Sequence, residues 1–124
     1  MNGRRAQRLL REEMGQRFYR LGQFLGCYLH EDWPEMHGTP SKAIDAAISE
    51  YPIKLLQQVR HEFALLLEET PNDVELRSKL GEGLGVRVHF KDPAEARAFA
   101  EQAEAKLMRS IKKHFDRNRE GNQE

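Results

Sequence analysis

The densest group of side chains able to do chemistry lies between residues 30 and 37. It consists of His30, Glu31, Asp32, Glu35 and His37. Such side chains bind zinc or hard cations when three or four of them converge from a fixed frame. Their spacing matches no ligand pattern, and the single cysteine of the chain does not join them. We therefore expect no metal site and no cofactor, and expect Asp32 or His30 to hydrogen-bond the turn backbone.

The remaining residues with catalytic potential are dispersed. None of the five histidines has a serine or the cysteine at a recognisable nucleophile spacing. Cys27 lies within an apolar run, and we expect it to be a small core residue rather than a reactive thiol. The run Gly81-Glu82-Gly83-Leu84-Gly85 is glycine-rich. A phosphate-binding loop, however, follows a strand and opens a helix, and here a helix is expected before the loop. We predict that the protein is not an enzyme.

Charge is distributed unevenly along the chain. Positions 30–50 hold five carboxylates against one lysine, and positions 62–75 hold five carboxylates without any basic residue. Residues 1–20 and 104–119 are basic. An acidic face on a rigid helical protein suits a basic partner, because it steers the encounter and fixes the register. In a second interpretation, the two basic ends pack beside the acidic middle and partly neutralise it.

The overall composition limits the class of protein. The 124 residues are enough for one domain with one modest core. Twenty basic and twenty acidic residues give zero net charge, which argues against a simple nucleic-acid binder. One cysteine permits no internal disulfide, and no apolar run approaches the roughly 20 residues of a membrane span. No apolar signal region closely follows the basic N-terminus, so we expect a cytoplasmic protein without membrane contact.

Apolar residues at helical spacing predict a first helix over about residues 4–29. Its stripe consists of Leu10, Met14, Phe18, Leu21, Leu25 and Tyr28. Gly15 and Gly22 each cost about 1 kcal/mol relative to alanine, so a kink or a break is compatible with the pattern. Gly22 and Gly26 share one face, where another backbone could approach closely. We expect Trp33 to pin the following corner onto the core.

Three start signals predict the later helices. Thr39-Pro40 opens a helix that ends at Tyr51-Pro52, and an amphipathic helix follows to about Glu69. Thr70, with Asp73 three residues on, is expected to cap a short helix whose apolar contacts are Val74, Leu76 and Leu80. Asp92-Pro93 opens the last helix, which should bury a stripe from Ala96 to Phe115 and end near Phe115.

The segment Val86–Phe90 alternates apolar and polar residues, which predicts a short extended piece. It should lie against the helices rather than pair with another chain. The expected fold is therefore mainly α. We predict a single domain over residues 1–124, a bundle of four to five helices with a Gly-rich, irregular or short extended segment before the last helix. Residues 1–3 and 117–124 are expected to be frayed.

One stretch carries a family resemblance. Residues 24–33, which read FLGCYLHEDW, resemble the FLG-x-Y-x-H-x-DW opening of one family of contact-dependent growth inhibition immunity proteins. The resemblance continues through the Thr39-Pro40 step and more loosely to Gly81. It covers about residues 18–81, and the C-terminal third and the basic N-terminus lie outside it. We expect the motif to be mostly structural, with only His30 and Asp32 available for direct contact.

The resemblance implies an immunity protein. Such a protein would bind the C-terminal toxin domain of a large secreted exoprotein one-to-one and block its active site or substrate face. These toxins are often nucleases, and a nuclease with a basic substrate cleft would suit the acidic middle of this chain. The expected contact residues are Glu31, Asp32, Asp45, Glu68, Glu69, Asp73 and Glu75.

Two other classes remain open. A small helical nucleic-acid-binding regulator would use the basic first and last helices as one patch, although the chain has no recognisable helix-turn-helix signature. A self-associating adaptor would use the face of Gly22 and Gly26 or the edge of Val86–Phe90.

Overall fold

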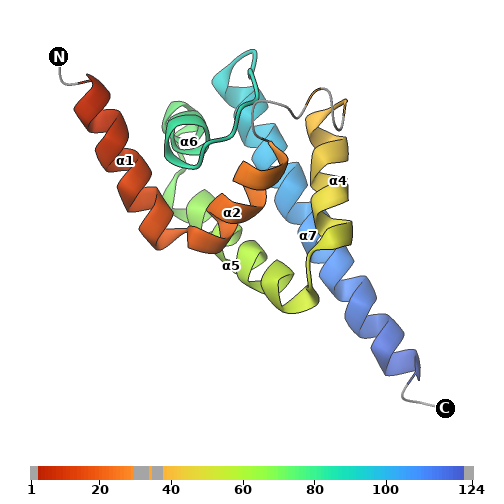
Figure 1. The fold of residues 1–124 in the computed structure, drawn as a ribbon. Coiled ribbons are helices and arrows are strands. Elements are labelled where there is room, and N and C mark those ends of the chain that lie inside the picture. Colours follow the sequence, from red (N-terminus) through yellow and green to blue (C-terminus); the bar gives the residue numbers. More distant parts are fainter. Residues whose placement is uncertain (1–2, 30–33, 35–37, 122–124) are drawn as a thin grey trace.

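The computed structural model describes residues 3–29, 34 and 38–121, and these residues are almost entirely helical. The α-helices are α1 (Gly3–Arg17), α2 (Tyr19–Tyr28), α4 (Pro40–Glu50), α5 (Ile53–Glu69), α6 (Asp73–Ser78) and α7 (Pro93–Gly121), with one π-helical turn, η1 (Lys79–Gly83) (Figure 1). The mainly α prediction is confirmed, and no strand occurs in this described part. Among the same residues, no helix is both long and apolar enough to cross a membrane.

The first predicted helix is two helices, so the described residues hold one α-helix more than the upper expectation of five. The break lies at Phe18, whose φ of −126° and ψ of 50° leave the helical region, and not at a glycine. The bend lets both Met14 and Phe18 be buried, with α1 packed on η1 and α2 packed on α5. A carboxylate oxygen of Glu62 on α5 accepts the N–H of Leu21 at 2.9 Å, which satisfies a free donor at the start of α2.

Two of the three start signals work as predicted. The Thr39 hydroxyl accepts the N–H of Lys42 at 3.1 Å, and Pro40 occupies the first turn of α4. The Asp92 carboxylate accepts the N–H of Glu95 at 2.9 Å ahead of α7. These side chains replace the hydrogen-bond partners that the first turn of a helix lacks.

The start of α6 differs from the prediction. Its cap is Asn72, whose side-chain oxygen accepts the N–H of Glu75 at 2.9 Å, and not Thr70. Thr70 ends α5 instead and is fully buried. Val74 was also expected in the core, yet it is 65% exposed. The reason is helical geometry, because Leu76 and Leu80 lie four residues apart on the inner face and Val74 lies on the opposite one.

The glycine-rich run extends a helix before it turns the chain. Residues up to Gly83 continue α6 as η1, and the chain leaves this turn at Gly85, where φ is +76°. Residues 85–90 are neither helix nor strand. Val86 and Phe90 are buried while Arg87 and His89 are exposed, an alternation that fits extended backbone. The N–H of Arg87 donates to the Leu29 carbonyl at 2.7 Å, so this segment runs beside the end of α2.

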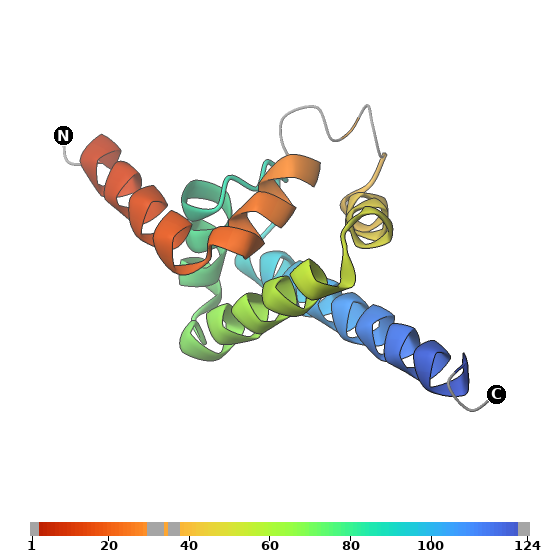
Figure 2. The same ribbon diagram turned by 60° about the horizontal axis from the view of Figure 1, so that its bottom comes forward.

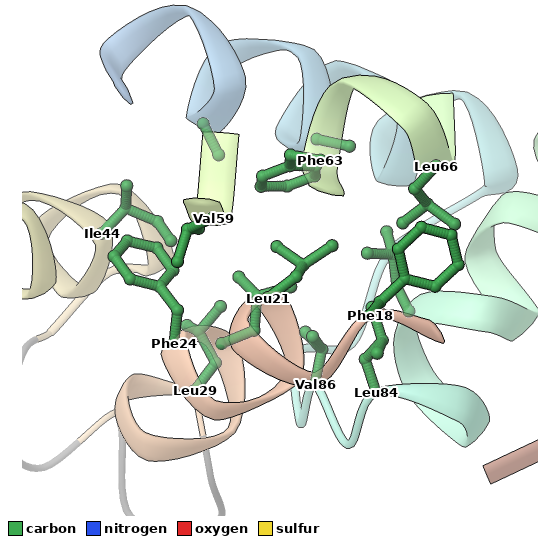
Figure 3. Packing of buried hydrophobic residues seen from close by; sticks show 14 of the residues in the cluster. Phe18, Leu21, Phe24, Leu29, Ile44, Val59, Phe63, Leu66, Leu84 and Val86 are labelled. Atoms are coloured by element: carbon green, nitrogen blue, oxygen red, sulfur yellow. The ribbon is translucent and has the colours of Figure 1, made fainter. Parts of the chain in front are cut away.

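The core lies around α2. Figure 3 shows Leu21 and Phe24 of α2 pointing toward Val59 and Phe63 of α5. Val86 belongs to the same cluster and lies beside the α2 residues. The face of Gly22 and Gly26 is covered from within the chain. A Cβ at Gly26 would stand 3.9 Å from the Leu84 carbonyl oxygen. The predicted close approach of another backbone is therefore present, and Leu84 supplies it.

The last helix is longer than predicted. It runs to Gly121 rather than to Phe115, so residues 117–121 continue the helix. Its buried stripe holds Ala96, Ala100, Ala103 and Leu107, and Phe115 is 45% exposed. The small alanines allow α5 to cross α7 closely, whereas the C-terminal turns of α7 project beyond the other helices (Figures 1 and 2). None of the other helices that the structure describes reaches these turns, which is why Phe115 is not buried.

Candidate functional site

The predicted acidic residues separate into two regions. Glu31 and Asp32 lie outside the described residues. Asp45 lies on α4, whereas the other four lie where α5 ends and α6 begins, on the opposite side of the bundle (Figures 1 and 2). We call this second region the α5–α6 corner. It consists of Glu68, Glu69, Asp73 and Glu75.

Basic side chains from distant parts of the sequence pair with the corner. Arg17 at the end of α1 donates two hydrogen bonds to the Glu69 carboxylate, at 2.9 and 2.6 Å. These hydrogen bonds hold the pKa of Glu69 below its ordinary value. Arg97 of α7 pairs with Asp73. Arg17 belongs to the basic segment 1–20, so the interpretation that the basic ends pack beside the acidic middle describes part of this surface, whereas Arg97 lies outside the basic segment 104–119.

Two carboxylates of the corner remain more available to a partner. Glu68 is exposed and has no ion-pair partner among the described residues. The Glu75 side chain is 56% exposed and lies 3.4 Å from Lys79. The Lys79 side chain is only 14% exposed, but it keeps Thr70 and Glu69 as partners when Glu75 turns to another molecule.

The buried Thr70 connects the α5–α6 corner to the neighbouring elements. The Thr70 hydroxyl accepts a hydrogen bond from the Lys79 ammonium at 2.9 Å, and its carbonyl accepts one from the Arg97 guanidinium. Lys79 and Arg97 thus connect the end of α5 to η1 and α7 while also facing Glu69 and Asp73. These contacts join the end of α5 to η1 and α7 and so position the corner.

Sequence reasoning missed the apolar neighbour of these charges. Val74 stands between Asp73 and Glu75 and is one of the most exposed large apolar side chains. It borders a groove of about 390 Å³ between α6, η1 and residues 87–90. The signal was present in the sequence, because Val74 is out of phase with Leu76 and Leu80 on the inner face of α6.

Asp45 has a different environment. Its carboxylate lies 2.8 Å from the Lys106 ammonium of α7, which also donates to the Ser41 hydroxyl. Lys106 and Ser41 border an apolar groove of about 250 Å³ between α4 and α7. Asp45 therefore helps to join two helices, and it is not continuous with the corner.

The family motif contributes to the core, as far as the structure describes it. Phe24 and Leu25 are buried, and the Tyr28 hydroxyl donates to the Glu50 carboxylate at the end of α4. Burial and this hydrogen bond raise the pKa of Tyr28 to about 12. His30, Asp32 and Trp33 lie outside the described residues.

The expectation for Cys27 was wrong, since its side chain is exposed. Cys27 is turned by roughly 100° from its neighbour Tyr28 and so leaves the inner face of α2. Within the described residues, no group of three or more histidine, cysteine or carboxylate side chains could hold a metal ion. The cluster from His30 to His37 is outside that search.

The arrangement of the basic segments disfavours a nucleic-acid regulator. The free end of α1 and the C-terminal end of α7 project from opposite ends of the molecule (Figures 1 and 2). The two basic segments therefore do not form the single patch that this alternative required.

Comparison with known proteins identifies the family. A search of curated proteins and a search of solved structures find no match to this chain. The family model of the CdiI immunity protein matches residues 17–107, from the end of α1 through most of α7. The match extends well beyond the resemblance seen in residues 18–81, and it includes the glycine-rich run and the stripe of alanines. Because it covers 91 of the 124 residues, the chain belongs to the CdiI immunity protein family, whose members neutralise toxins.

Proposed function

We propose that this chain binds the C-terminal toxin domain of a large secreted exoprotein in a one-to-one complex. Binding covers the active site or the substrate face of the toxin, which is a nuclease. The observation that carries the proposal is the family match over residues 17–107, which includes most of the buried core. The inhibitor acts by occupying the surface of the toxin and contributes no catalytic group.

The α5–α6 corner is the contact surface that charge favours. A nuclease must attract a polyanion, so its substrate face is basic and complementary to exposed carboxylates. Glu68 and Glu75 would meet this face directly, whereas Glu69 and Asp73 hold the corner together through Arg17 and Arg97. An interface of standard size covers about 800 Å² on each partner. We therefore leave Asp45, on the opposite side of the bundle, out of the proposed contact.

The test begins with complex formation. The chain is purified together with the toxin domain encoded directly upstream of its gene, and the mass of the complex is measured by light scattering. A one-to-one complex that loses nuclease activity supports the proposal. Two free proteins and an active toxin would refute it.

Charge reversal then tests the surface. Glu68→Lys and Glu75→Lys should each weaken toxin binding at least about tenfold, because a like charge in an interface costs several kcal/mol. Asp116→Lys is the matched control. Asp116 is also exposed, but it lies on the projecting end of α7. Calorimetric titration at two salt concentrations measures the affinity of each variant for the toxin domain. If both corner variants bind as tightly as the wild type, the toxin contacts another surface of the protein.

A further inference from the structure

An extended part of the chain has main-chain groups without partners. In the described residues, no hydrogen bond involves the main-chain N–H or C=O groups of Val88, His89 or Phe90. The neighbouring Val86 and Arg87 do donate their N–H groups, to the carbonyls of Leu80 and Leu29. Unpaired main-chain groups of an extended segment form a row that another extended segment can pair with.

The two existing hydrogen bonds show which way this row faces. Along an extended segment, the N–H and C=O groups of successive residues point to alternate edges. The N–H of Val86 points to Leu80 in η1, at a distance of 3.0 Å, so Val88 and Phe90 present their groups on this same edge. The N–H of Arg87 points to the carbonyl of Leu29 at the end of α2, on the opposite edge of the segment. The main-chain groups of His89 therefore face this opposite edge as well.

The edge with Val88 and Phe90 faces an open groove. This groove of about 390 Å³ lies between α6, η1 and residues 87–90, and its border includes Val74, Arg77 and Glu82. It borders the α5–α6 corner, because Val74 lines the groove and adjoins Glu75 of the corner, and both side chains are exposed. Arg77 and Arg87 place positive charges on the rim of the groove, and Glu82 places a negative one there.

We propose that an extended segment of the toxin lies in this groove and adds as a β-strand to Val88–Phe90. This proposal rests on the proposed function, and it specifies how the toxin is held next to the corner. Main-chain hydrogen bonds supply part of the affinity, while Val74 contacts an apolar side chain of the segment and Arg77 pairs with an acidic one. Continuity with the corner favours the toxin over a second copy of this chain as the occupant.

Amide hydrogen exchange tests the pairing without any substitution. The amides of Val88 and Phe90 should exchange quickly in the free protein and at least about tenfold more slowly in the complex with the toxin domain. The amide of His89, which faces the other edge, should change little. Protection of Val88 and Phe90 that appears without toxin and grows with protein concentration would assign the edge to a second copy and overturn the proposal.

A pair of proline variants provides the matched mutational test. Val88→Pro removes a donor that faces the groove, and His89→Pro removes one that faces away, in the same segment. The first should weaken toxin binding at least about tenfold and the second less than about threefold. Val88→Ala measures the loss of the side chain alone, and urea unfolding shows whether each variant is folded.

The outcomes separate this inference from the proposed function. If the complex forms but the amides stay unprotected, strand addition is refuted while the immunity function stands. If the folded wild-type chain and the toxin domain form no complex, both proposals fail.

Discussion

Replacement of Gly83 by alanine should destabilise the protein because of one close contact. A Cβ at Gly83 would stand 2.7 Å from Cγ and 3.3 Å from Cβ of Met14. These Met14 atoms are near the α1 backbone, so a change of side-chain rotamer cannot move both away, and the packing of α1 on η1 must shift. Gly22 is the matched control. A Cβ there would lie 3.6 Å from Cδ2 of Leu84, an ordinary contact.

The magnitude follows from two opposing terms. Overpacking of a core costs about 1–3 kcal/mol, whereas alanine in helical backbone gains up to about 1 kcal/mol over glycine. Gly83→Ala should therefore lower the free energy of unfolding by about 1–2 kcal/mol. Gly22→Ala should raise it by about 0.5–1 kcal/mol.

Urea and thermal unfolding measure both variants. A change of 1 kcal/mol corresponds to a shift of roughly 4 °C in the unfolding midpoint for a protein of this size. In the double variant Gly83→Ala with Met14→Ala, the 2.7 Å contact with Cγ is absent and only the 3.3 Å contact between the two Cβ atoms remains, so the cost of the alanine at position 83 should be smaller. A Gly83→Ala protein as stable as the wild type would refute the assignment of a tight contact between α1 and η1.

Three further predictions concern charges and hydrogen bonds. Glu62→Ala should lower the free energy of unfolding by about 1–2 kcal/mol, since it removes the acceptor at the start of α2; an unchanged urea midpoint would contradict it. The pKa of Glu69 is held below 4.5, so stability should fall as the pH drops from this value, and Arg17→Gln should flatten that dependence. Burial and a hydrogen bond raise the pKa of Tyr28 from 10.0 to about 12, so stability should fall as the pH rises through this window. Tyr28→Phe should remove this alkaline loss, and an identical alkaline curve for the variant would count against it.

Local signals in the sequence were sufficient for most of the helices. Thr39-Pro40 and Asp92-Pro93 combine a capping side chain with a proline that suits the first turn, and both helices begin there. The amphipathic helix predicted after Pro52 buries Leu56, Val59, Phe63 and Leu66, whereas Ile53 at its start is only half-buried. These features depend on residues close together in the chain, which is why the sequence contains them.

Features that depend on distant residues were not predictable in the same way. The break at Phe18 allows α1 and α2 to pack on different partners. Gly15 and Gly22 indicated a kink or a break in this stretch, but no local residue marks its position at Phe18. Thr70 resembles a helix cap in sequence, but in the structure it is buried and accepts hydrogen bonds from Lys79 and Arg97. The last helix continues past Phe115 without a packing partner, so its apolar spacing suggested burial that the tertiary structure does not provide.

The candidate site was predicted in part. The acidic composition of residues 62–75 pointed to the α5–α6 corner, but the pairing of Glu69 with Arg17 joins residues 52 positions apart. The separation of Asp45 from the corner also required the arrangement of α4 and α6 in space. The orientation of the unpaired edge at Val88 and Phe90 follows from the hydrogen bonds of the preceding residues to Leu80 and Leu29. The sequence shows the alternation of apolar and polar residues in this segment, but it does not show these hydrogen bonds.

Protection of living cells is the most direct test of the central claim. The upstream toxin domain is produced in cells from an inducible promoter, with this chain, with its variant carrying both Glu68→Lys and Glu75→Lys, or with neither. Growth should continue with the wild-type chain, stop without it, and be only weakly restored by the variant at equal protein levels. Arrest of growth despite abundant, folded wild-type chain would contradict the account.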